Sequence, residues 1–70
     1  MSVAKVVEIK SSSKVSFDDA MKSGIKRAAK TLENISGAWI SDQEIFVEKD
    51  KIVEYRVLMK VTFVLKDKTK

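Results

Sequence analysis

The strongest constraint on the fold is an alternation of apolar and polar residues in the C-terminal third of the chain. Seven consecutive odd positions from Val53 to Leu65 are apolar or aromatic. The even positions between them carry mostly polar or charged side chains, among them Glu54, Arg56, Lys60 and Thr62. A period of two over about 13 residues is typical of a strand with one buried face. The pattern therefore predicts a long strand over 53–65 whose second face meets water or a polar cavity.

A strand and a helix are predicted before it. β-branched residues dominate 3–10 and favour a strand, which the serine run 11–13 is expected to end. Ser16 is a good N-cap with Asp19 three residues later, so a helix is expected to begin there. Apolar residues then recur at spacings of three and four, at Phe17, Met21, Ile25, Ala28, Leu32 and Ile35. This stripe predicts a helix of about 18 residues that stops near Gly37.

A second strand is predicted over 38–48, joined to the last strand by a tight hairpin turn at Lys49 and Asp50. The expected fold class is α+β, with the order β-α-β-β. Its three-stranded antiparallel sheet curls around the single helix, and one domain spans 1–70. Periodicity leaves open whether the last strand lies at the centre or the edge of the sheet.

This arrangement predicts self-association. The last strand would span roughly 43 Å and the helix only about 27 Å, so one helix cannot cover the apolar face of the sheet. A chain of 70 residues without cysteine has a thin core and no disulfides to stabilise it. A bent sheet and contacts with other copies of the chain are the expected solutions.

Composition argues against several classes of function. The chain has no histidine and no cysteine, which argues against a zinc site and against most nucleophile–base catalysis, so we expect no enzyme. No apolar run approaches a membrane span, and the N-terminal residues lack a signal-peptide core, so a cytoplasmic location is expected. The net charge of +4 is interspersed along the chain. The basic helix face has no stacking aromatic residue, so we expect it to be solvated rather than to bind nucleic acid.

Three segments of the chain resemble the dodecin family. They are the opening segment 2–9, the helix segment 27–35, and the segment 51–63 with Tyr55 and Phe63. The resemblance covers almost the whole chain and implies a hollow homododecameric shell that stores flavin, riboflavin or FMN, without catalysis. It also implies a tryptophan after the helix that stacks on the flavin ring and a glutamine in the last strand that contacts the ring's polar edge. Here these two positions hold Gly37 and Arg56.

Trp39 is the only tryptophan and the first candidate for a flavin contact. If the second strand begins here, its side chain lies on the same face as Gly37, about 7 Å further along. Its indole suits stacking on a flat ring, and the alternative is a tryptophan buried in the core or a subunit interface. Arg56 offers donors to flavin carbonyls or a phosphate, and the alternative is a structural ion pair with a carboxylate across the sheet, such as Glu54 or Asp42 of a neighbour.

The remaining candidates are polar residues. Asp42 and Gln43 are expected either to bind a ribityl chain or to be solvated, and Lys5 either to contact phosphate or to line a subunit contact. An acidic stretch with Asp42, Glu44 and Glu48 suits calcium or magnesium if copies meet on a symmetry axis, and otherwise a solvated face. The leading hypothesis is thus a flavin-storing shell. The alternative is a shell without the usual flavin site that serves a structural, ion-binding or anion-binding role.

Overall fold

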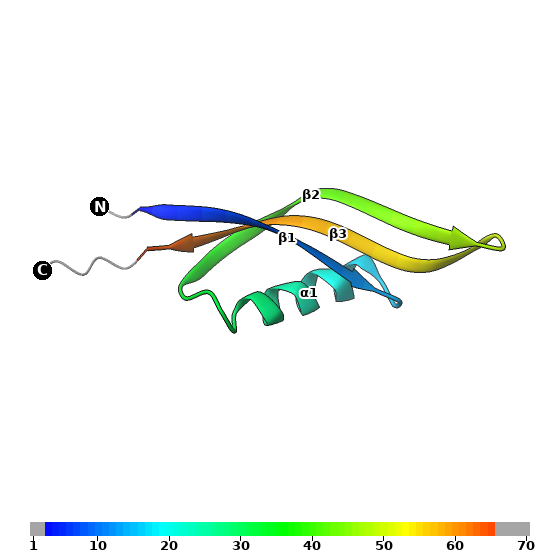
Figure 1. The fold of residues 1–70 in the computed structure, drawn as a ribbon, viewed down its shortest axis with the longest axis horizontal. Coiled ribbons are helices and arrows are strands. Elements are labelled where there is room, and N and C mark those ends of the chain that lie inside the picture. The colour runs from blue at the N-terminus through cyan, green and yellow to red at the C-terminus, as the bar shows by residue number, and fades with distance from the viewer. Residues whose placement is uncertain (1–2, 66–70) are drawn as a thin grey trace, which may run out of the picture.

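The computed structural model describes residues 3–65 and has the predicted order of elements. It consists of β1 (Ala4–Ser13), α1 (Phe17–Ala28), β2 (Ile35–Glu48) and β3 (Lys51–Val64). The sheet is antiparallel throughout, with the order β1-β3-β2, so the long alternating strand lies at the centre. Figure 1 shows α1 against one face of a long, twisted sheet whose two ends extend past the helix.

The core lies between α1 and the odd positions of β3. Val57, Met59 and Val61 are at most 1% exposed, and Ala20 of the helix completes the buried cluster. The alternation therefore correctly predicted the buried face over its central part. The two ends of the predicted strand are more exposed than its centre. Val53 is 37% exposed at an irregularity in the pairing of β2 with β3, and Leu65 is 45% exposed just after the end of β3.

The helix is shorter than the predicted 18 residues. It begins as expected, with the Ser16 hydroxyl accepting a hydrogen bond of 2.9 Å from the backbone N–H of Asp19. It ends at Ala28, followed by tight turns and by Asn34 with φ 63°, which leads the chain into β2. Leu32 precedes β2 and Ile35 begins it, so neither residue extends the helix, and Gly37 lies within the strand rather than at a helix end.

Small residues let the helix approach the sheet closely. The buried positions of α1 are Ala20, Gly24 and Ala28, while the larger residues of the predicted stripe flank them and are only partly buried. A Cβ atom built on Gly24 would lie 2.6 Å from Cε of Met59 and 2.9 Å from Cβ of Ser11. The serine run does not end the first strand as predicted, because Ser11, Ser12 and Ser13 continue its pairing with β3.

The hairpin turn lies where the sequence predicted it. Lys49 and Asp50 have φ values of 51° and 65°, as a two-residue turn of the I′ type requires, although neither residue is glycine. The turn extends the β2–β3 hairpin well beyond α1 (Figure 1), and the molecule is 59 Å long. The 12-residue helix is only about 18 Å long, so it covers even less of the sheet than predicted.

Candidate ligand-binding site

The sheet has a polar face that α1 does not cover, which we call the outer face. It is defined by the even positions of β3 and by the residues that pair with them. Its members, from the register, include Glu8, Lys10 and Ser12 of β1, Gly37, Trp39, Asp42, Glu44 and Phe46 of β2, and Arg56, Leu58 and Lys60 of β3. Four of the six predicted site residues lie here: Gly37, Trp39, Asp42 and Arg56.

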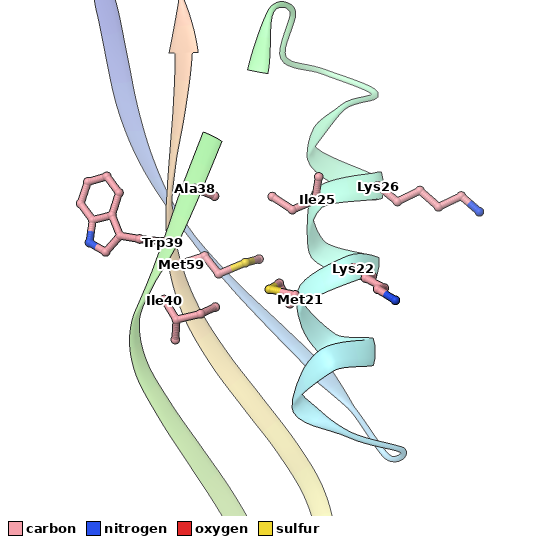
Figure 2. Close-up of a pocket in the computed structure, with 8 residues that line it drawn as sticks. All are labelled: Met21, Lys22, Ile25, Lys26, Ala38, Trp39, Ile40 and Met59. Atoms are coloured by element: carbon pink, nitrogen blue, oxygen red, sulfur yellow. The ribbon is translucent and has the colours of Figure 1, made fainter. Parts of the chain in front are cut away.

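Trp39 is 49% exposed and lies opposite Lys60. In Figure 2 its indole points away from α1, whereas Ala38, Ile40 and Met59 point toward the helix. The indole is therefore not part of the core of this chain. Gly37 lies on the same outer face, and no atom lies within 4 Å of a Cβ built on it. The outer face thus presents the indole of Trp39 near the open space at Gly37.

An irregularity in β2 places Asp42 on the same face as Trp39. In a regular strand two residues three positions apart point to opposite faces. Here Ile40 pairs with Met59 and Asp42 with Leu58, so Ser41 is an extra residue that resets the alternation. The Ser41 hydroxyl donates a hydrogen bond of 3.2 Å to the carbonyl of Leu58. Bulges commonly redirect side chains near functional sites, and no periodicity in the sequence indicated this one.

Arg56 is held by contacts within its own chain. Its Nη2 and Nε donate hydrogen bonds of 3.0 and 3.3 Å to Oε2 of Glu54, and its guanidinium lies 4.2 Å from the ring centroid of Phe46. The ion pair expected as the alternative for Arg56 is therefore present. The hydrogen bond from Arg56 lowers the pKa of the Glu54 carboxyl, with smaller contributions from Ser12 and Lys14, against partial desolvation.

Two small clefts adjoin Arg56. One, of about 110 Å³, is lined by Lys10, Asp42, Gln43, Glu44, Arg56, Val57 and Leu58. The other, of about 240 Å³, is lined by Lys10, Ser11, Ser12 and Arg56. The structure thus brings three of the predicted residues, Asp42, Gln43 and Arg56, to one place. It adds Lys10, which sequence reasoning missed, although its polar position at the end of a strand is a signal for it.

Two predicted residues do not belong to the outer face. Lys5 pairs with Phe63 and Gln43 with Val57, so both side chains belong to the face that α1 covers. Gln43 still lines the first cleft, and its backbone N–H donates a hydrogen bond of 3.0 Å to Oδ1 of Asp42. Lys5 lies toward the opposite end of the sheet from Arg56 and forms no part of either cleft.

Apolar surface remains uncovered on both sides of α1. A largely apolar cleft of about 380 Å³ lies between α1 and β2 (Figure 2). It is lined by Met21, Lys22, Ile25, Lys26, Ala38, Trp39, Ile40 and Met59. Another, of about 560 Å³, lies between α1 and β1. The hairpin beyond the helix exposes Val47 at 55% and Ile52 at 48%. Uncovered apolar surface of this kind is typical of subunit contacts.

Within residues 3–65, neither a metal-binding cluster nor a membrane-spanning helix is present. No three acidic side chains within residues 3–65 come close enough to hold a metal ion. The predicted acidic stretch of β2 is therefore not a metal site within one chain. No helix in the same range has both the length and the apolar character needed to cross a membrane.

Comparisons with known proteins agree with this geometry. The family model named Dodecin matches residues 3–66. The calcium dodecin of Mycobacterium tuberculosis is 30% identical over 63 residues, covering 90% of this chain and 89% of that protein. A dodecin from Streptomyces davaonensis superposes with a TM-score of 0.90 at 29% identity, covering 94% of this chain and 97% of that one.

Two further solved structures show the same fold. A point mutant of the Thermus thermophilus dodecin has a TM-score of 0.90 at 25% identity, covering 96% of this chain and all of that one. The solved structure of the M. tuberculosis calcium dodecin, described as calcium chelating with a novel calcium-binding site, has a TM-score of 0.79 at 25% identity, covering 97% of each chain. From the family match over nearly its whole length, the chain belongs to the dodecin family.

Proposed function

We propose that the protein assembles into a homododecameric shell and stores flavin at its subunit contacts, without catalysis. The observation that carries this proposal is Trp39, an indole half exposed on the outer face beside the open space at Gly37. A large exposed aromatic ring loses little conformational freedom on binding and favours stacking against another flat ring. A flavin has such a ring, and the family resemblance suggests it.

Assembly is supported by what a single chain leaves uncovered. The clefts beside α1 and the exposed apolar residues of the hairpin need a partner surface, and another copy of the chain can supply it. On this proposal two copies bring their outer faces together, so that a flavin lies between them. Asp42 and Arg56 are the proposed polar contacts to its ribityl chain and ring edge.

A fluorescence titration tests the proposal. Adding the ligand-free protein to riboflavin is expected to quench flavin emission to saturation at a fixed ratio of flavin to subunit. Trp39→Ala should abolish this quenching, whereas Trp39→Phe, which keeps an aromatic ring, should retain weaker binding. Sedimentation of each variant checks that the assembly is intact. The absence of quenching by the unmodified protein at high concentration would reject flavin binding.

Ion binding is a second candidate. It is favoured by the 30% identity to a protein named calcium dodecin and by Asp42, Glu44 and Glu48 at alternate positions of β2. Since these carboxylates form no site within one chain, copies would have to share the ion. Calorimetric titration with calcium tests this, and Asp42→Asn should weaken any binding. A cytoplasmic location remains a prediction that cell fractionation can check.

A further inference from the structure

The face of the sheet that α1 covers continues along the β2–β3 hairpin past the start of the helix (Figure 1). Tyr55 marks this limit, because its ring lies edge-on to that of Phe17, the first residue of α1, at a centroid distance of 5.2 Å. Ile45 lies opposite Tyr55, and Val47 follows two positions later on the same face, opposite Ile52. Ile45, Val47 and Ile52 are 43%, 55% and 48% exposed. They form an apolar surface that their own helix does not reach, which we call the hairpin patch.

A second apolar surface lies beside α1. The cleft of about 380 Å³ between α1 and β2 has an apolar floor that includes Met21 and Ile25. Lys22 and Lys26 adjoin this floor, and in Figure 2 both extend from α1 away from the sheet. Nζ of Lys22 lies 3.2 Å from Oδ2 of Asp18, whereas Lys26 forms no ion pair within residues 3–65. No acidic side chain of the described range lines the cleft.

The hairpin and the helix carry opposite charge. Segment 42–54, the outer part of the hairpin, holds five acidic and two basic side chains. Segment 20–30, which includes most of α1, holds four basic side chains and no acidic one. A contact between two hairpins or between two helices would bring like charges together, which disfavours both arrangements. A contact between the hairpin of one copy and the helix of another joins opposite charges and covers both apolar surfaces.

One chain cannot make this contact with itself. The hairpin patch lies beyond the first residue of α1, whereas the cleft lies along the middle of the helix, and β2 contributes to both. A contact between copies uses a different surface on each partner, so every copy keeps one hairpin and one cleft for a further neighbour. Head-to-tail contacts of this kind close into rings when the rotation between copies permits.

We propose that the hairpin patch of one copy docks in the cleft between α1 and β2 of the next copy. Val47 and Ile52 contact the apolar floor of the cleft, and carboxylates of the hairpin lie beside Lys22 and Lys26. The inference rests on the proposed assembly into a shell and specifies a head-to-tail contact within it. The contact uses the face of the sheet toward α1, so it leaves the outer face for the proposed flavin.

Cross-linking tests the contact directly, because the chain has no cysteine of its own. Val47→Cys and Ile25→Cys are combined in one chain, and the assembly is treated with a mild oxidant or a short bismaleimide. A non-reducing denaturing gel should show covalent chains longer than dimers, since each copy contributes both positions. Each single variant should stay monomeric on the gel. As a matched control, Val6→Cys, an equally exposed valine on the outer face, should not cross-link to Ile25→Cys.

A charge reversal tests the electrostatic part of the contact. Lys26→Glu should raise the concentration at which the assembly dissociates by at least about threefold, and the effect should shrink as salt is added. Lys30→Glu makes the same change at an exposed position that does not line the cleft, and should leave that concentration nearly unchanged. Both lysines are exposed, so both variants are expected to fold. Equal effects of the two substitutions in sedimentation would overturn the assignment of the cleft.

The outcomes separate this contact from the proposed function. An intact assembly that binds flavin but gives no cross-link in the double-cysteine variant would overturn the contact and leave flavin storage standing. Dimers formed by Val47→Cys alone would show that hairpins meet each other, and would also overturn it. An unmodified chain that sediments as a monomer would overturn the proposed shell and the contact together.

Discussion

The two faces of β3 differ in how far a single chain buries them. On the face toward α1, which we call the inner face, Val57, Met59 and Val61 are almost fully buried within one chain. On the outer face, Arg56, Leu58 and Lys60 alternate with them and stay partly exposed, and the neighbouring Trp39 is half exposed. Successive residues of one strand therefore have different surroundings: the odd positions form the core of the chain, and the even positions stay partly exposed.

The largest expected effect on stability comes from truncating a buried side chain of the inner face. Met59→Ala should destabilise the chain by about 2–5 kcal/mol, because Met59 is fully buried and its loss leaves a cavity against α1. The neighbouring outer-face variant Leu58→Ala should cost less than about 1 kcal/mol. Chemical denaturation measures both. Similar costs for the two variants would contradict the division between the faces.

A smaller effect is expected where α1 touches the inner face. Gly24→Ala places a methyl group 2.9 Å from Cβ of Ser11 and 2.6 Å from Cε of Met59. The flexible Met59 can move, but β1 must shift to relieve Ser11. We expect a net loss of about 1–2 kcal/mol, since overpacking exceeds the gain in helix propensity. A more stable variant in thermal unfolding would show that the helix does not pack this closely.

The N-cap of α1, the helix that covers the inner face, gives a third and local test of stability. Ser16→Ala removes the hydroxyl that accepts the N–H of Asp19, and should cost about 1 kcal/mol. Ser23→Ala, an exposed serine within the same helix, serves as the control and should change the stability by less than about 0.5 kcal/mol. Equal effects of the two substitutions in denaturant titrations would argue against the cap.

The smallest effect is expected on the outer face and depends on pH. The hydrogen bond from Arg56 lowers the pKa of Glu54 below its ordinary value of 4.5. The ionised carboxylate is therefore favoured in the folded chain, so its contribution is complete above the unfolded-state pKa and is lost as the pH falls through the lowered one. In an NMR titration, Arg56→Gln should move the pKa of Glu54 upward. An unchanged pKa would mean that Ser12 or Lys14 dominates.

Sequence reasoning succeeded where one chain supplies both partners of an interaction. The alternation over 53–65 predicted the buried face, Ser16 predicted the helix start, and Lys49 and Asp50 predicted the turn. These features depend on local periodicity, capping and chain reversal. The resemblance of three segments to dodecins was confirmed by the family match over residues 3–66.

The errors arose where packing overrides local pattern. The apolar Leu32 and Ile35 continued the helical spacing, yet the chain leaves the helix after Ala28 and passes through a left-handed Asn34 to begin β2. The bulge at Ser41, which puts Asp42 beside Trp39 on one face, has no signature in the sequence. The site could thus be predicted as a set of residues, but the pattern did not show that Gln43, like Lys5, lies on the face toward α1 while the other four lie on the outer face.

The most direct test of the outer face as a binding surface is a crystal structure of the assembled protein grown with FMN. We predict the flavin ring against the indole of Trp39, on the face of the sheet away from α1 and between two copies of the chain. Flavin found instead in the apolar clefts beside α1, or none at saturating concentration, would contradict the account.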